Sequence, residues 1–291
     1  MTGVLFGLLG ATLIGVSDCV ARVTAQRVSM AVLLAAVMGL STIALTALLA
    51  VTGQWPAWHA YGWITSGVSG FLNLVALYLL YTALARGPVS VASPSASVFS
   101  VLLVALNAAT GAPFVWQQAA AILLVFLGVA MLARRGRSHE QFDAAHLRLT
   151  ALFGLAAAVS IAARMFLAQE AGDALGPISA LYLNRVFALA GVVAILFFGR
   201  LRSQRLSWPG DTRMTVLVLI QALLETLALA SFLVGSEGVG RIGASIGFAS
   251  FAAVTALTAW LWLGEPIGWR RAFWMAVVGC GIVIAIAGTP A

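Results

Sequence analysis

Charged residues are unusually scarce in this sequence. Only 9% of its 291 residues are charged, where an average soluble domain carries about 25%, while 62% are hydrophobic and the mean hydropathy is +1.04. So little polar surface cannot coat a water-soluble globule, and the apolar content also excludes intrinsic disorder. Lysine is absent, and all sixteen basic residues are arginines. Most of them lie in short gaps between apolar runs, which is typical of membrane orientation and not of a basic face that binds nucleic acid.

Metal ligands and phosphate-binding motifs are equally scarce. Both cysteines, Cys19 and Cys280, lie inside apolar runs, so we expect neither a disulfide nor a thiolate metal site. The three histidines lie in predicted loops, and no apolar run carries His, Asp and Glu at metal-ligand spacing. The Gly-x-x-x-x-Gly-Lys-Ser/Thr phosphate loop is missing, which excludes ATP-driven pumping by this chain alone. We therefore expect no metal and no cofactor.

Apolar runs long enough to cross a membrane follow one another along the chain. A membrane-spanning helix needs about 20 such residues. Ten runs occur, separated by short breaks rich in Gly and Pro, at residues 3–22, 30–52, 61–84, 88–109, 116–133, 149–169, 177–199, 213–236, 239–263 and 269–288. The first run has no basic residue before it, so we interpret it as a retained helix and not as a signal peptide. The pattern predicts an all-α integral membrane protein with ten transmembrane helices.

The two halves of the chain resemble each other. Thr110–Trp116 and Leu263–Trp269 share a Gly-x-Pro-x-x-Trp pattern, and three further matches keep the same offset: Gly87 with Gly240, Ser97 with Ser250, and Gly128 with Gly281. The alternative is chance similarity between apolar runs. Because five helices per half is an odd number, the second half would enter the membrane from the opposite side, as in transporters built from inverted repeats. We predict a first repeat at 1–133, a cytoplasmic linker at 134–148 and a second repeat at 149–291.

The arginines predict the orientation. One side of the predicted membrane holds Arg22, Arg27, Arg86, Arg134, Arg135, Arg137, Arg148, Arg200, Arg202, Arg205, Arg213, Arg270 and Arg271. The loops of the other side hold Arg241 alone. Because basic loops stay in the cytoplasm, both termini are predicted to be periplasmic in a bacterial inner membrane.

Two segments resemble a known transporter family. Tyr81–Pro94 is similar to the junction between helices 3 and 4 of the EamA type of the drug/metabolite transporter superfamily, and Leu263–Pro266 is similar to its turn between helices 9 and 10. The whole chain resembles this family, and within it the branch of bacterial aromatic-amino-acid exporters. The resemblance implies a ten-helix basket around a central cavity, built largely from helices 1, 3, 4, 6, 8 and 9, and efflux of small metabolites. Ala112 stands where the second half has Glu265, so this position cannot be a symmetric ligand.

Glu225 is the strongest candidate residue for the substrate site. It lies midway in the run 213–236, with Gln221 one helical turn earlier on the same face. The duplication places Asn73 opposite it at matched depth in the third run. A charge at mid-bilayer costs about 2.5–3.5 kcal/mol on insertion scales, so the carboxylate should face a cavity or a partner. The alternative is a structural pair with Arg164 or Arg185.

Arg164 and Arg185 are the two arginines within predicted spans. A guanidinium there could hold a substrate carboxylate through two parallel hydrogen bonds. The alternatives for Arg164 are snorkelling to the interface or pairing with Glu170 and Asp173, and Arg185 could equally be an interhelical anchor. Asp18 lies one turn from Arg22, and a local ion pair is the preferred interpretation there.

Tyrosine and serine side chains supply the remaining candidates. Tyr78 and Tyr81 share a face of the third helix; Tyr78 could grip an aromatic or amphipathic substrate, and for Tyr81 we prefer a place in the aromatic belt at the interface. Ser93 and Ser97 belong to a polar face of the fourth run, where they could line the pathway or let helices approach closely. For the matching Gly240, Gly243 and Gly247 we prefer close packing.

These residues favour a secondary transporter that exports small amphipathic metabolites, amino acids first among them, by alternating access. Its expected partners are a small-molecule substrate and the lipid bilayer, with no nucleic acid; proton coupling is left open, as is a monomer or a homodimer. Exporters of other metabolites or drugs are the alternative within the same family. A membrane-embedded enzyme is the alternative of a different class, disfavoured because no catalytic constellation is present.

Overall fold

The computed structural model is helical wherever it describes the chain. It describes residues 2–87, 89–96, 98–111, 116–132, 144–201, 210–264 and 269–287, and none of these forms a strand. The first half contains α1 (Thr2–Ala25), α2 (Met30–Thr52), α3 (Ala60–Arg86), α4 (Val89–Ala96), α5 (Phe99–Ala109) and α6 (Trp116–Leu132). The second half contains α7 (Ala144–Leu175), α8 (Pro177–Leu201), α9 (Thr212–Gly235), a 3-10 turn at Gly238–Gly240, α10 (Arg241–Ala249), α11 (Phe251–Leu263) and α12 (Trp269–Ala287).

Seven segments of the described chain are long and apolar enough to cross a membrane: Thr2–Ala25, Met30–Thr52, Ala60–Arg86, Ala145–Leu175, Pro177–Phe198, Thr212–Gly235 and Gly238–Trp262. This confirms the all-α membrane class. The other predicted spans correspond to α4 with α5, to α6 and to α12, so the count of ten stays a prediction. Helix α7 begins at Ala144, so residues 144–148 of the predicted linker are helical, while residues 134–143 lie outside the described chain; the division into two repeats and a linker at these bounds stays a prediction.

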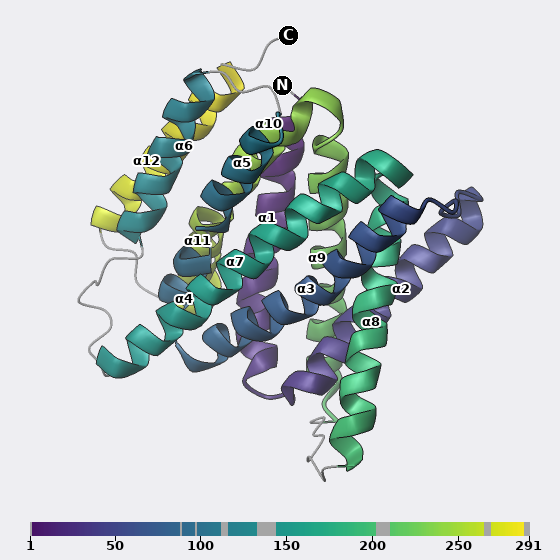
Figure 1. Cartoon of the computed structure of the whole chain (residues 1–291). Helices are drawn as coiled ribbons and strands as arrows, with labels where there is room; N and C mark the ends of the chain where they lie inside the picture. The colour runs from purple at the N-terminus through teal and green to yellow at the C-terminus, as the bar shows by residue number, and fades with distance from the viewer. Residues whose placement is uncertain are drawn as a thin grey trace.

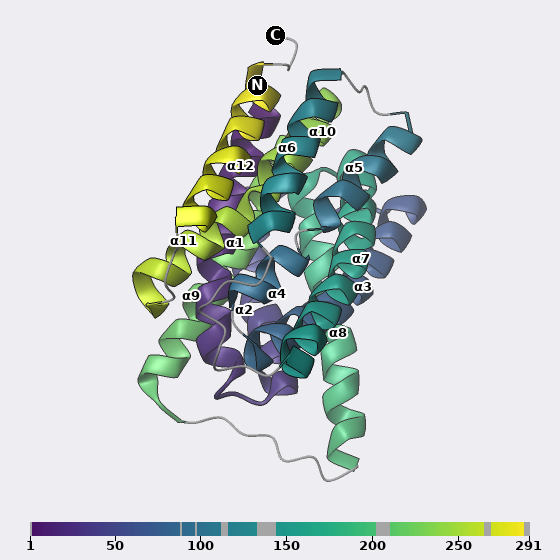
Figure 2. The ribbon, with the colours of Figure 1, turned by 90° about the vertical axis from the view of Figure 1, so that its left-hand side faces the viewer.

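The two halves run in opposite directions. In Figure 1, α1 starts at the upper end, where both termini lie, and runs downward, whereas α7 starts at the lower end and runs upward. The packing follows the same symmetry: α1 packs on α9, α10 and α11, just as α7 packs on α3, α4 and α5. Helix α2 packs on α8, and α6 packs on α12, side by side also in Figure 2. The first helix of each half thus packs on the third and fourth spans of the other half, as an inverted repeat requires.

The fourth span of each half is broken at the same relative place. Helix α4 ends at Ala96 and α5 begins at Phe99, while α10 ends at Ala249 and α11 begins at Phe251. At the second break the Ser250 hydroxyl donates to the Gly247 carbonyl at 2.7 Å, and the Ser250 N–H bonds the same carbonyl at 3.2 Å. Such a bond from serine back to its own helix tightens and bends it. Ser250, whose sequence match in the first half is Ser97, therefore lies at the second break.

Glycines bring α1 against α10 at backbone contact. A Cβ on Gly7 would lie 2.3 Å from the Ala244 carbonyl oxygen, and a Cβ on Gly247 would lie 2.4 Å from that of Val4. The atoms met are backbone atoms, which cannot rotate away. The packing role preferred for Gly240, Gly243 and Gly247 is confirmed, since α1 or the end of α9 fills the space beside each.

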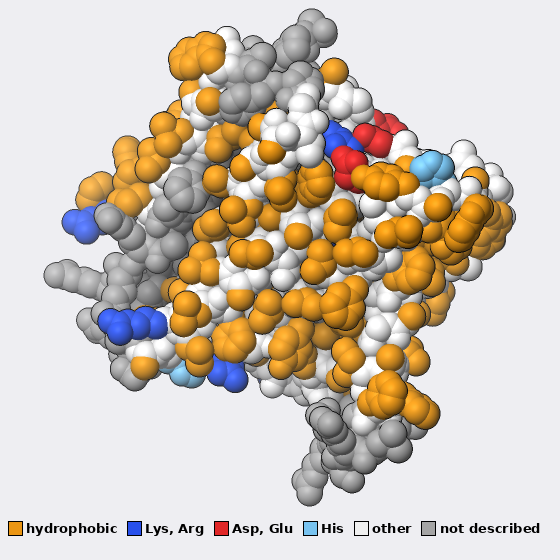
Figure 3. Space-filling view, viewed as in Figure 1, with side chains coloured by type: hydrophobic (Ala, Val, Ile, Leu, Met, Phe, Trp, Pro, Cys, Tyr) orange, Lys and Arg blue, Asp and Glu red, His pale blue; other side chains and the backbone are white. Residues whose placement is uncertain are grey.

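The outside of the molecule is apolar, as a lipid-facing surface should be. Large side chains such as Ile43, Ile64 and Phe197 are each at least 65% exposed. Figure 3 shows hydrophobic side chains across the middle of one face, with charged groups near its upper and lower margins. This arrangement fits a belt of lipid around the helices.

Candidate substrate site

A cavity lies in the middle of the helix bundle, between the two halves. It is lined from both halves by Ile14, Asp18, Asn73, Ala76, Leu77, Leu80, Phe99, Ile161, Arg164, Glu225, Leu229, Phe248 and Phe251. Its volume is about 30 Å³, room for about two water molecules. The sequence-predicted Glu225, Asn73 and Arg164 therefore meet at one place, although each comes from a different helix.

Glu225 is anchored at one end of this cavity. The Tyr81 hydroxyl donates to Glu225 Oε1, and Gln221 Nε2 donates to the Tyr81 oxygen at 2.6 Å and to Glu225 Oε1 at 3.4 Å. Thr24 of α1 donates in turn to Gln221 Oε1 at 2.7 Å. Both bonds to the carboxylate end on Oε1, and Glu225 is 3% exposed. The cluster fixes the position of Glu225 and gives Gln221 a positioning role.

The two buried arginines have few hydrogen bonds to the described residues. Arg185 donates through Nη1 to the Met38 sulfur at 3.3 Å, while its Nε and Nη2, and Nε of Arg164, are buried without a partner among those residues. In the described part of the chain no carboxylate lies within 4 Å of either guanidinium. Glu225 is nevertheless near enough to interact electrostatically with both.

The local alternatives for Arg164 are wrong. Glu170 and Asp173 pair with Arg241 instead, at 2.7 and 2.6 Å. Arg164 itself is 7% exposed, which excludes snorkelling to the interface. A contact between Glu225 and a guanidinium is likewise absent from the described residues; Tyr81 and Gln221 both bond its Oε1 instead.

The two tyrosines of α3 lie on the opposite sides from those predicted: Tyr81 is buried and Tyr78 is exposed. Tyr81 is 1% exposed and bonded to Glu225, so its assignment to the aromatic belt is wrong. Tyr78 is 51% exposed and lies outside the cavity lining. The buried stripe of α3 follows Asn73, Leu77 and Leu80, and Tyr78 projects roughly a third of a turn away from it.

The serine candidates cannot be placed in the same way. Ser93 lies within α4, but its side chain is outside the described part, and Ser97 falls outside the described residues altogether. Asn73 is fully buried at the cavity wall; its Nδ2 contacts the Met38 sulfur at 3.6 Å, and its Oδ1 has no hydrogen-bond partner among the residues that the structure describes.

Sequence reasoning missed the aromatic wall of the cavity. Phe99, Phe248 and Phe251 lie next to the two helix breaks, and their ring centroids are 5.7 to 6.4 Å apart. Phe232 adds a fourth ring, 5.2 Å from Phe248. The available signal was the Ser97–Ser250 match, which marks the breaks beside these rings.

Asp18 also faces this cavity, which the sequence did not predict. The Thr255 hydroxyl donates to Asp18 Oδ2 at 3.4 Å. Arg22, one turn further along α1, donates to the carbonyl oxygens of Leu84 and Gly87. Asp18 is thus a second carboxylate of the cavity, on the opposite half from Glu225.

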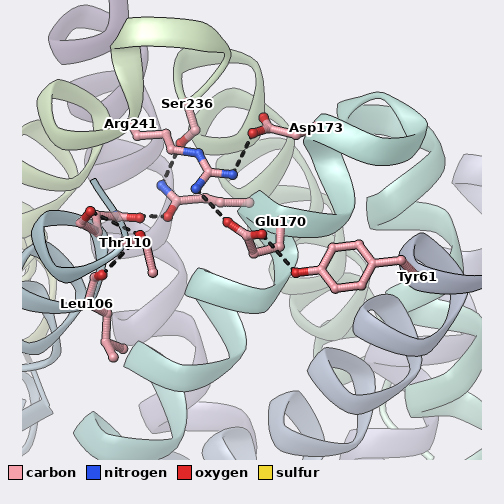
Figure 4. Close-up of polar contacts among 9 residues, drawn as sticks. Tyr61, Leu106, Thr110, Glu170, Asp173, Ser236 and Arg241 are labelled. Carbon is pink, nitrogen blue, oxygen red and sulfur yellow. Dashed lines mark hydrogen bonds and ion pairs between the residues drawn. The ribbon is translucent and has the colours of Figure 1, made fainter. Parts of the chain in front are cut away.

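A rim network joins the two halves near the N-terminus; it consists of Tyr61, Asn107, Gln169, Glu170, Asp173, Ser236 and Arg241. Figure 4 shows Arg241 between Glu170 and Asp173, with the Tyr61 hydroxyl donating to Glu170 at 2.9 Å. Gln169 accepts from Asn107 at 2.9 Å and donates to Ser236 at 3.0 Å. The network ties α3 and α5 of the first half to α7, α9 and α10 of the second.

Comparison with known proteins gives the same architecture. The EamA-like transporter family matches the chain over residues 1–134 and 148–287. A crystal structure of another protein superposes with a TM-score of 0.74 at 16% sequence identity, covering 98% of this chain and 96% of that one, and so shows a shared fold. Among curated proteins none matches the sequence.

Proposed function

The chain belongs to the EamA-like transporter family, a family of membrane transporters, and on that premise we propose that it exports small amphipathic metabolites across the bacterial inner membrane. Amino acids are the first substrates to test. Transport would proceed by alternating access, with the two halves moving against each other around the central cavity.

The mixed lining of the cavity carries this proposal. The rings of Phe99, Phe248 and Phe251 supply apolar surface at the two helix breaks, while Asp18, Glu225 and Arg164 supply charged groups. A molecule with an apolar body and a charged head matches such a site. A wholly apolar molecule would leave the buried charges unpaired.

The volume of the cavity supports alternating access. A cavity of about 30 Å³ holds no metabolite, so the helices must separate to admit one. The rim network closes the bundle at one end, and the matched breaks in α4–α5 and α10–α11 provide places at which the helices can bend.

Transport in proteoliposomes tests this function. A panel of radiolabelled amino acids, amines and sugars is offered at two pH values, with and without an imposed gradient, and empty liposomes are the control. We expect saturable flux of at least one amphipathic solute, recovered chemically unchanged. Recovery of a chemically altered solute would favour the membrane-embedded enzyme, and no flux of any solute would contradict the proposal.

The orientation can be tested separately. With arginine-rich loops in the cytoplasm, a C-terminal alkaline phosphatase fusion should be active, and a C-terminal green fluorescent protein fusion should stay dark. Fusions truncated within the linker at Arg137 serve as the opposite control and should fluoresce. A fluorescent C-terminus without phosphatase activity would overturn the orientation and leave the fold intact.

The rim network should hold one end of the pathway shut. Replacing Arg241 with Gln removes both ion pairs. At about 0.5 kcal/mol for each pair, about 1 kcal/mol in all, their loss shifts the opening equilibrium roughly fivefold. We expect a maleimide to label Leu233→Cys several-fold faster in this variant, with Cys19 and Cys280 replaced by Ser. Arg213→Gln, at the start of α9, is the control. Equal labelling rates would show that the network does not close this end.

A further inference from the structure

Unsatisfied polar atoms gather around the two buried guanidinium groups. Of the seven buried side-chain nitrogen and oxygen atoms without a partner in the described chain, three belong to Arg164 and Arg185. A fourth is Oδ1 of Asn184, the residue next to Arg185. Arginine stays protonated inside proteins, so these groups are charged and need an anion or polar partner.

Within the described residues, no carboxylate lies at contact distance from either guanidinium. Glu225 is held by Tyr81 and Gln221, and Glu170 and Asp173 are held by Arg241. An uncompensated buried charge is strongly destabilising, and it persists where a ligand completes the pair. The missing partner is therefore to be sought in the substrate.

Arg164 stands between two cavities. It lines the central cavity with Glu225, and it also lines a second, smaller one with Asn184, Phe232 and Leu233. Two residues that line the second cavity, Ala168 and Leu233, come shortly before Gln169 and Ser236 in the sequence. Gln169 and Ser236 are hydrogen-bonded to each other in the rim network. A solute that moves from the centre toward the rim would pass this guanidinium.

We propose that Arg164, whose electrostatic interaction with Arg185 adds a second positive charge nearby, binds the carboxylate of the transported solute, and that the protein selects zwitterionic or anionic substrates over cationic amines. This inference rests on the proposed transport function and names its substrate class. A guanidinium presents two parallel N–H groups that match the two oxygens of a carboxylate. An ammonium group on the same solute would meet Glu225, whose hydrogen bonds within the described residues end on Oε1 and leave Oε2 for a cation.

Three probes that differ by one group test the selectivity. Phenylalanine carries carboxylate and ammonium, 3-phenylpropionate only the carboxylate, and phenethylamine only the ammonium; the phenyl ring suits the aromatic wall in all three. Binding to the purified protein in detergent is measured by tryptophan fluorescence. We expect phenylalanine to bind tightest, 3-phenylpropionate next, and phenethylamine at least tenfold more weakly than 3-phenylpropionate. Phenethylamine binding as tightly as the two acids overturns the inference.

Arg164→Gln and Arg164→Lys test the residue itself. Both should weaken binding of the two carboxylates at least tenfold, since glutamine loses the charge and lysine loses the planar fork. The exposed Arg27→Gln is the control and should bind as the unchanged protein does. Undiminished binding by both Arg164 variants contradicts the inference.

Thermal melting separates this site from a structural one. Because no carboxylate of the described residues contacts Arg164, Arg164→Gln should melt at the same or a higher temperature in the absence of solute. A lower melting temperature together with normal carboxylate binding would make Arg164 structural and overturn the inference. Arg164-dependent binding without transport would refute the export function alone, whereas transport of phenethylamine in preference to the acids would refute the substrate class alone.

Discussion

Glu225→Gln should abolish accumulation driven by a proton gradient while leaving exchange of substrate between the two sides of the membrane. The substitution keeps the shape of the side chain and its hydrogen bonds to Tyr81 and Gln221 but removes the ionisable proton. A carboxylate inside a membrane is tolerated where water or a partner reaches it. Glu225 lines a cavity that has room for water, and it accepts a hydrogen bond from Tyr81. The measurement is uptake in proteoliposomes against pH, with and without a gradient.

The matched control for this variant is Tyr81→Phe. It removes the hydroxyl that donates to Glu225 but keeps the carboxylate and the ring, so coupling should persist with a displaced pH profile. If Glu225 only binds substrate, Glu225→Gln should weaken affinity by the worth of a charged hydrogen bond, about 1.5–3 kcal/mol, and the pH dependence should remain. Normal transport, normal pH response and normal melting together would remove Glu225 from the site and leave Asn73 and Arg164.

Valine at Gly7 should prevent the protein from folding stably. The first carbon of any side chain there would lie 2.3 Å from the Ala244 carbonyl oxygen, so α1 must move away from α10. Overpacking typically costs about 1–3 kcal/mol, and a backbone clash belongs at or above the upper end of that range. We expect a loss of monodisperse protein on size-exclusion chromatography after mild heating in detergent.

Gly39→Ala gives the comparison for that experiment. Its Cβ would find the nearest atom, Leu189 Cδ1, at 3.9 Å, which is ordinary contact. Alanine in the middle of α2 should stabilise the helix by about 0.5–1 kcal/mol, because it loses less backbone freedom than glycine. Equal melting of Gly7→Val and Gly39→Ala would mean that α1 and α10 do not pack at backbone contact.

The fold could be predicted from the sequence largely because membrane insertion leaves a strong one-dimensional signal. The spacing of residues in the sequence is enough to show this signal, which consists of the long apolar runs, the repeated Gly-x-Pro-x-x-Trp pattern and the matched serines. The helix breaks were harder to foresee, since an apolar run such as 239–263 reads as one span whether or not it bends. The same holds for the start of α7, where residues 144–148, with His146 and Arg148 among them, extend the helix ahead of the apolar run.

The site could be predicted only as a set of candidates, because its assembly depends on rotation of each helix. Glu225, Gln221 and Asn73 were identified from burial of polar groups in apolar runs, a rule that does not require knowing the neighbours. Tyr78 and Tyr81 lie three residues apart on α3, and which of them faces inward depends on how α3 packs against α7. Phe99 and Phe248 carry no polar signal, so only the three-dimensional arrangement shows them as a cavity wall.

The tight central cavity also determines how affinity should respond to mutation. If the form that can admit a solute makes up only about 1% of the population, the measured dissociation constant is about a hundredfold weaker than that of the open form. Variants that loosen the Arg241 ion pairs would then bind solute more tightly without touching it. The gain of affinity in such rim variants would measure how much of the intrinsic binding free energy is used to open the protein.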